Sequence, residues 1–151
     1  MSTFSAVGST ANTDATTLLY FANKASTFRR LKAHEVIIGS DAVPVEQSAA
    51  YQIRRITDEN VTPGGDSVTP FVWDEDQVAS IADAISNPSG EPTYAAGAGL
   101  EIGLTQRGTF RWVAQPFREL VCSALEDHGW ATFMESVTTA FNANVTMVWD
   151  E

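Results

Sequence analysis

The strongest constraint on the fold of this chain is the stretch 100–114, where large apolar residues alternate twice with polar or small ones. The alternation covers 100–105, and Phe110 and Trp112 repeat the spacing after a short break. A period of two is typical of a β-strand with one buried face. Gly108 can adopt a positive φ at no steric cost, which suits a tight turn. The stretch therefore predicts a β-hairpin at the centre of a sheet, with both aromatics in the core.

Further short segments carry strand signals, because they alternate or are rich in β-branched and aromatic residues between turn-forming residues. They cover residues 16–25, 28–39, 50–57, 68–73, 118–123, 130–138 and 144–151. Pro70 removes a backbone donor from the segment 68–73, which predicts an edge strand. Residues 117–141 also fit an apolar stripe at helical spacing, and a helix there would make the class α+β.

One segment, residues 74–86, has the pattern of a short helix. Asp74 can cap it, and Gln77 follows at the spacing of a capping box. Apolar residues then recur at i, i+3, i+4 and i+7. With many short strands and few helical segments, we expect an all-β fold, a β-sandwich that is jelly-roll-like, with one short helix near 75–86. Residues 1–15 are expected to form an N-terminal arm or weak strand, and residues 16–151 a single domain.

The charge and the composition exclude several classes of protein. The formal net charge is −10, from 9 basic and 19 acidic residues, which argues against nucleic acid as a partner because phosphate binding needs a basic face. No apolar run reaches the length of a membrane-spanning helix, so no membrane partner is expected. The N-terminal residues lack a basic segment followed by an apolar one, which predicts no signal peptide.

The sequence predicts no catalytic, cofactor-binding or metal-binding residue, and we expect a protein that is not an enzyme. Cys122 is the single cysteine, which excludes an internal disulfide and a multi-cysteine zinc site, and it is expected in the core. His34 and His128 are far apart in sequence and belong to no metal-ligand motif. No G-x-S-x-G elbow is present, and the G-x-G at 97–99 precedes a strand instead of following one.

Six residues are candidates for contact with a partner. Two lie in the N-terminal arm, two on the predicted edge strand, one at the hairpin tip and one on the outer face of the hairpin. They are Phe4, Val7, Pro70, Trp73, Arg107 and Arg111.

Several short runs resemble small virion proteins of tailed phages. They are LKAHEVIIGSD at 31–41, YQIRR at 51–55, EPTY at 91–94, QRGTFRWVA at 106–114 and VWDE at 148–151. The resemblance covers most of the chain from residue 31, and it favours strands over 117–141. It implies a bacteriophage structural protein of the capsid decoration or cement type, made in the host cytoplasm and located on the virion.

The partners implied by this resemblance are the major capsid protein and further copies of the chain, possibly as a homotrimer. An alternative is a carbohydrate- or receptor-binding β-sandwich module of a phage tail or fibre. In that case Trp73 would be the exposed platform on which a sugar stacks.

Overall fold

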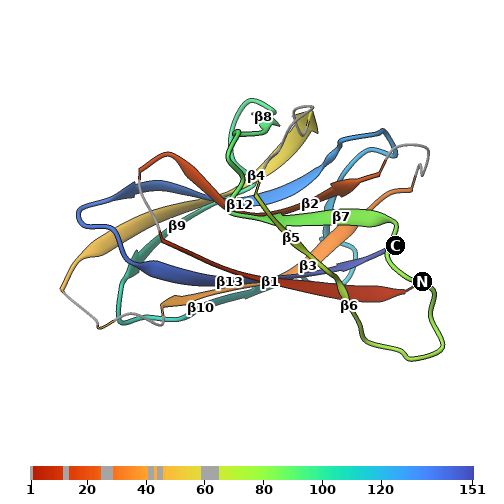
Figure 1. The fold of residues 1–151 in the computed structure, drawn as a ribbon, viewed down its shortest axis with the longest axis horizontal. Helices are drawn as coiled ribbons and strands as arrows, with labels where there is room; N and C mark the ends of the chain where they lie inside the picture. The colour runs from red at the N-terminus through yellow and green to blue at the C-terminus, as the bar shows by residue number, and fades with distance from the viewer. Residues whose placement is uncertain (1, 12–13, 25–28, 41–42, 44–45, 59–64) are drawn as a thin grey trace.

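The protein is described by a computed structural model that covers residues 2–11, 14–24, 29–40, 43, 46–58 and 65–151. Two antiparallel sheets pack face to face, and the described residues contain no helix. Figure 1 shows the sheets as two layers, one above the other, with both chain ends on the same side. The expected all-β class and the β-sandwich are therefore confirmed.

The lower layer of Figure 1, sheet A, has the order β10-β3-β13-β1-β6, and β11 also pairs with β3. Its strands are β1 (Thr3–Ala11), β3 (Lys32–Ser40), β6 (Phe71–Val72), β10 (Phe110–Val113), β11 (Leu120–Val121) and β13 (Asn142–Asp150). The first strand of the chain thus pairs with the last, from Thr3 opposite Asp150 to Ala11 opposite Asn142.

The upper layer, sheet B, has the order β5-β7-β2-β12-β4-β8, and β9 also pairs with β4. Its strands are β2 (Thr16–Asn23), β4 (Ser48–Asp58), β5 (Asp66–Val68), β7 (Ala82–Ser86), β8 (Thr93–Tyr94), β9 (Leu100–Thr105) and β12 (Gly129–Val137). Here the second strand of the chain, β2, pairs with the last but one, β12. This pair is nested in sequence inside the β1–β13 pair of sheet A.

The core between the sheets forms because each strand turns alternate side chains inward. Trp149 on β13 lies at its centre, fully buried, and stacks on Phe21 of β2 with 4.5 Å between ring centroids. Phe4 of β1 stacks on the same indole at 6.2 Å. Phe110 and Trp112 are half-buried and pack against the core from β10.

The short helix expected near 75–86 is wrong. Asp74 does act as a local cap, since it accepts from the amide of Asp76 (3.1 Å), but the chain then makes a turn instead of a helix. Residues 82–86 form β7, where Ala82, Ala84 and Ser86 are buried and the residues between them are half-buried. The buried positions of this strand hold small residues, Ala82, Ala84 and Ser86, so its alternation is not visible in the pattern of large apolar side chains.

The hairpin expected over 100–114 is also wrong, although both of its strands exist. The first becomes β9, which pairs with β4 in sheet B, and the second becomes β10, which pairs with β3 in sheet A. The turn at 106–109 carries the chain from one sheet to the other. The positive φ expected at Gly108 is not found there, and its amide donates to the carbonyl of Thr105 (2.8 Å).

The predicted edge strand over 68–73 is split. Pro70 lies between β5, at the edge of sheet B, and β6, at the edge of sheet A. The segment 117–141, for which helix was the alternative, contains strands: only Leu120–Val121 of the predicted strand 118–123 pairs, and β12 covers the other. The predicted strand 28–39 begins at Lys32, and Phe28 lies outside the described residues.

Candidate docking surface

The outward side of sheet A leaves large apolar side chains exposed. We call it the open face and define it by Val7, Ile37, Phe71 and Val113, which point away from the core on four different strands. Val7, Phe71 and Val113 are 59%, 66% and 51% exposed. The register places Phe71 and Val113 at opposite edges of this side, in one row with Ser5, Val148 and Glu35 between them, and places Val7 and Ile37 in a neighbouring row on either side of Thr146. Exposed apolar residues gathered on one face are a mark of an interaction site.

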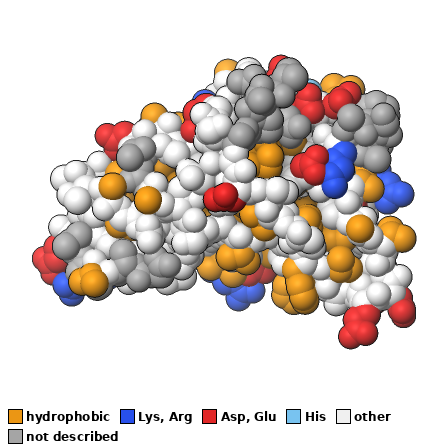
Figure 2. Space-filling model, viewed as in Figure 1, with side chains coloured by type: hydrophobic (Ala, Val, Ile, Leu, Met, Phe, Trp, Pro, Cys, Tyr) orange, Lys and Arg blue, Asp and Glu red, His pale blue; other side chains and the backbone are white. Residues whose placement is uncertain are grey.

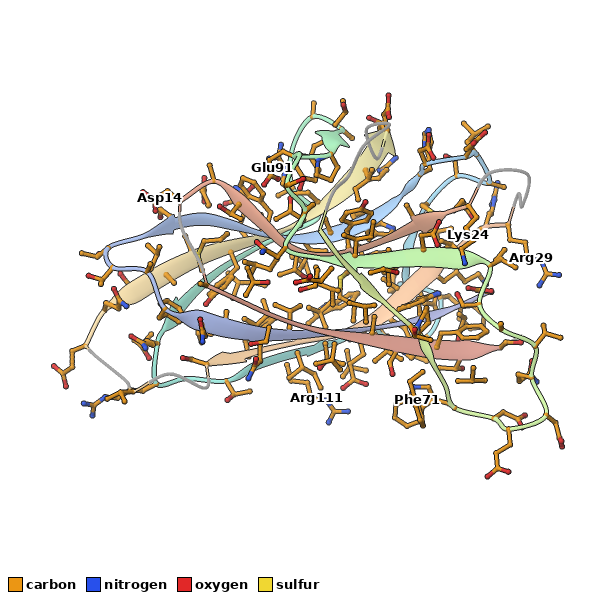
Figure 3. The ribbon with its side chains drawn as sticks, in the orientation of Figure 1. Asp14, Lys24, Arg29, Phe71, Glu91 and Arg111 are labelled. Carbon is orange, nitrogen blue, oxygen red and sulfur yellow. The ribbon has the colours of Figure 1, made fainter. Side chains whose placement is uncertain are left out.

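An ion pair lies on the open face. Arg111 donates from Nε to Oε1 of Glu35 over 2.5 Å, between neighbouring strands. The hydrogen bond to this carboxylate raises the pKa of Arg111 above its usual value. Arg111 is therefore engaged within the chain, and the exposed apolar residues of this face stand among polar ones such as Ser5, Ser9 and Thr146. Figure 3 places Arg111 and Phe71 along the same lower rim.

The segment from β6 to β7 extends the open face. Trp73 is 63% exposed and stands edge-on to Phe71, with 6.3 Å between the ring centroids. Val78 is 74% exposed. Between them lie three exposed acids, residues 74–76. Figure 2 shows hydrophobic side chains along this lower rim and acidic ones at the tip of the projecting segment.

The outward side of sheet B is covered by the chain itself. Tyr20, Ala22, Ile56 and Ala131 are each 0% exposed and form a second apolar cluster, separate from the core. The side chain of Tyr94, from β8, packs against this cluster. We call this the covered face.

Polar contacts fix the cover in place. Thr17 donates from its amide to Glu91 (2.9 Å), and its hydroxyl also contacts Glu91 and the hydroxyl of Tyr94. The guanidinium of Arg54 lies 4.2 Å from the centroid of the Tyr94 ring, and Phe133 meets that ring edge-on. Burial raises the pKa of Tyr94, so the phenol stays neutral.

The six candidate contact residues fall in different environments. Phe4 is fully buried under Trp149 and is not available to a partner. Val7 is exposed on the open face, and Trp73 is exposed beside it. Pro70 is half-buried between the two sheet edges. Phe71 and Val113 were not among the candidates, and the alternation that exposes them could have identified them only if the outward face of sheet A had been known.

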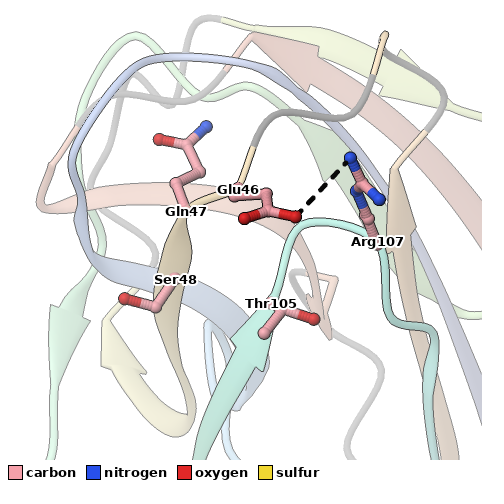
Figure 4. Close-up of a pocket in the computed structure, with 5 residues that line it drawn as sticks. All are labelled: Glu46, Gln47, Ser48, Thr105 and Arg107. Atoms are coloured by element: carbon pink, nitrogen blue, oxygen red, sulfur yellow. Dashed lines mark ion pairs between the residues drawn. The ribbon is translucent and has the colours of Figure 1, made fainter.

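Arg107 lies apart from the other five, beside a pocket of about 370 Å³ shown in Figure 4. The pocket is lined by Glu46, Gln47, Ser48, Thr105 and Arg107. Its one ion pair joins Arg107 to Glu46 at 3.9 Å, and both side chains are mostly exposed. An exposed pair at this distance contributes little, and the described lining residues include neither a nucleophile–base pair nor a cluster of charges aimed at a ligand.

The contact that comes nearest to a catalytic arrangement is between Ser123 and His128, whose Oγ and Nδ1 lie 2.6 Å apart. A nucleophile also needs its base to be oriented by a third group. Among the described residues, no carboxylate is bonded to the other nitrogen of His128. The pair is explained by the turn that both residues flank. Burial raises the pKa of Cys122, which keeps that thiol protonated.

Metal-ligand clusters and membrane-spanning helices are both absent from the described residues. No group of three or more His, Cys, Asp or Glu side chains is arranged to hold a metal ion. No helix long and apolar enough to span a membrane is present in that part of the chain. Comparison with protein-family models, with curated proteins and with solved structures found no match for this chain.

Proposed function

We propose that this chain is a structural protein without enzymatic activity, which binds the outside of a phage capsid and stabilises it. The observation that carries the proposal is the contrast between the two outward faces. Sheet B covers its apolar cluster with Tyr94, whereas sheet A leaves Val7, Phe71 and Val113 more than half exposed. A face of this kind gains free energy when a second surface excludes water from it, about 25 cal/mol for each Å² buried.

The order of the strands supports the same class. Sheet A contains the path β1-β13-β3-β10, and the sheet packed against it, sheet B, contains the path β2-β12-β4-β9. This nested pairing of first with last and second with last but one is the one expected of a jelly roll, an architecture found in viral capsid domains and also in lectins. Together with the resemblance of the five sequence runs to phage virion proteins, it favours a virion role.

The charge is compatible with this role. A chain of net charge −10 is soluble on its own and is attracted to a positively charged partner surface. We therefore propose the major capsid protein as the partner and the capsid surface as the location. A homotrimer is proposed as the bound form, since three copies around a symmetry axis would each present one open face.

The test is cosedimentation of the purified protein with emptied capsids that lack it, followed by electron microscopy. We expect saturable binding, with capsids that then resist heat or dilution better than bare ones. Phe71→Ser should weaken binding at least tenfold, because a large apolar side chain would be removed from the contact. Phe117→Ser is the matched control, since Phe117 is 95% exposed on a turn outside the open face. A protein that never sediments with capsids would contradict the proposal.

One observation favours the alternative, a carbohydrate-binding module. Trp73 and Phe71 form an exposed aromatic pair next to carboxylates, and sugars bind by stacking on such rings and bonding to such acids. A glycan array separates the two functions. Specific glycan binding that is lost in Trp73→Ala would favour the module, and an empty array beside capsid binding would favour the capsid protein.

A further inference from the structure

The free edge of β6 carries unused backbone hydrogen-bonding groups. The amide of Trp73 donates to the carbonyl of Thr3 (3.2 Å), so residues 71 and 73 turn their backbone groups toward β1. Because these groups alternate along an antiparallel strand, the N–H and C=O of Val72 point away from β1. Among the described residues, no hydrogen bond reaches either group. An unpaired strand edge can accept another strand, and here the edge is short, because β6 has two residues, follows Pro70 and offers only the N–H and C=O of Val72.

A pocket lies on the inner side of this edge. It measures about 300 Å³ and is lined mainly by small or apolar side chains of β5, β6, β7 and the segments between them, with the Lys24–Asp83 ion pair (3.1 Å) at its margin. Val68, Pro70, Val72 and Ala79 are among the residues that line it. Figure 1 shows the chain passing here from β5 to β6, from the upper layer to the lower. The volume is more than sufficient for one large aliphatic side chain.

The surroundings of the edge are acidic on one side and aromatic on the other. Asp66 at the start of β5 and the acids at 74–76, which follow β6 in the chain, are exposed, and Lys24 at the pocket forms an ion pair with Asp83. On the outer side stand the rings of Phe71 and Trp73. A strand laid along β6 would therefore place alternate side chains in the pocket and against these rings, with its ends among carboxylates.

We propose that the free edge of β6 binds an extended, basic segment of a partner protein by strand addition. Main-chain hydrogen bonds to Val72 give affinity, and one aliphatic side chain in the pocket gives specificity. Lys or Arg on either side of that residue meets the acids. The inference rests on the proposed function only in taking the major capsid protein as the owner of the segment.

The test uses two synthetic peptides, KRVLVRK and its acidic counterpart EEVLVEE, with the intact protein. We expect the basic peptide to shift the NMR signal of the Val72 amide saturably and to protect that amide from hydrogen exchange, with a Kd below about 1 mM. The acidic peptide should bind at least tenfold more weakly. No saturable shift at Val72, or equal binding of both peptides, would overturn the inference.

Two variants separate strand addition from general charge attraction. Ala79→Phe fills the pocket from an exposed position and should reduce binding of the basic peptide at least tenfold, whereas Ala96→Phe, at an exposed position elsewhere, should leave it unchanged. Unchanged binding by Ala79→Phe would also overturn the inference. Because the peptides replace the capsid, peptide binding by a protein that ignores capsids would leave the inference intact and remove the proposed function.

Discussion

The two outward faces of the sandwich differ in whether their apolar side chains are covered by the chain. On sheet B, the chain lays β8 and Tyr94 over an apolar cluster and holds them with Thr17, Glu91 and Arg54. On sheet A, apolar side chains of comparable size are left in water. The difference shows that sheet B buries its outward apolar cluster within the chain whereas sheet A does not, and the external contact proposed above rests on this difference.

The largest effect in this comparison is expected at Gly129, on the covered face. A Cβ built there would lie 1.8 Å from the carbonyl oxygen of Phe21, which is backbone and cannot move aside. We expect Gly129→Ala to destabilise the protein by about 3 kcal/mol or more, or to prevent folding. Gly39→Ala is the control on sheet A, because its nearest contact would be Thr109 at 3.7 Å. Urea unfolding measures both, and similar stabilities would show that sheet B is less tightly packed than described.

A smaller effect is expected where side chains are removed from the two faces. Tyr94→Ala takes away the cover of sheet B and should cost about 2–3 kcal/mol of unfolding free energy. Phe71→Ala removes a ring that is 66% exposed and should change stability by less than about 0.5 kcal/mol. The comparison fails if Phe71→Ala is the more destabilising of the two by calorimetry.

A dependence on alkaline pH is also expected from sheet B, since Tyr20, Tyr51 and Tyr94 all lie on its strands. Burial raises the pKa of Tyr51 to about 12, above the ordinary value of 10.0 for a tyrosine. Between pH 10 and 12 the unfolded chain therefore releases a proton that the folded chain keeps. Stability should fall over this window by up to about 1.4 kcal/mol per pH unit from this residue. Denaturation curves of Tyr51→Phe should show a shallower fall, and an identical slope would contradict the assignment.

The sequence was sufficient for the class of fold because strands alternate wherever a sheet has one buried face. It failed where small residues carried the alternation, as in Ala82 and Ala84 of β7, since Val78 and Ile85 happened to match helical spacing. It also failed at 106–109, because a turn between two strands looks the same whether the strands pair with each other or with different sheets.

The docking surface was predictable only in part. Trp73 stood out because it follows Pro70 beside an acidic cluster, and it is exposed. Phe4 was misplaced because strand β1 looked like an arm, whereas its pairing with β13 draws the ring under Trp149. Val113 could not be identified, since its exposure depends on which side of β10 faces the core, and that is set by the pairing with β3.

The pairing of β1 with β13 also sets the order in which the molecule can assemble. In sheet A, β13 lies between β3 and β1, and Thr3 must meet Asp150 from the far end of the chain. During synthesis, sheet A lacks its central strand until β13 has left the ribosome, so β1 and β3 cannot be joined before then. Such long-range closure is slow, on the order of milliseconds to seconds, and until then β1 and β3 present unpaired edges. Sheet B, whose strands are complete at residue 137, can therefore form before β13 is available to pack against it.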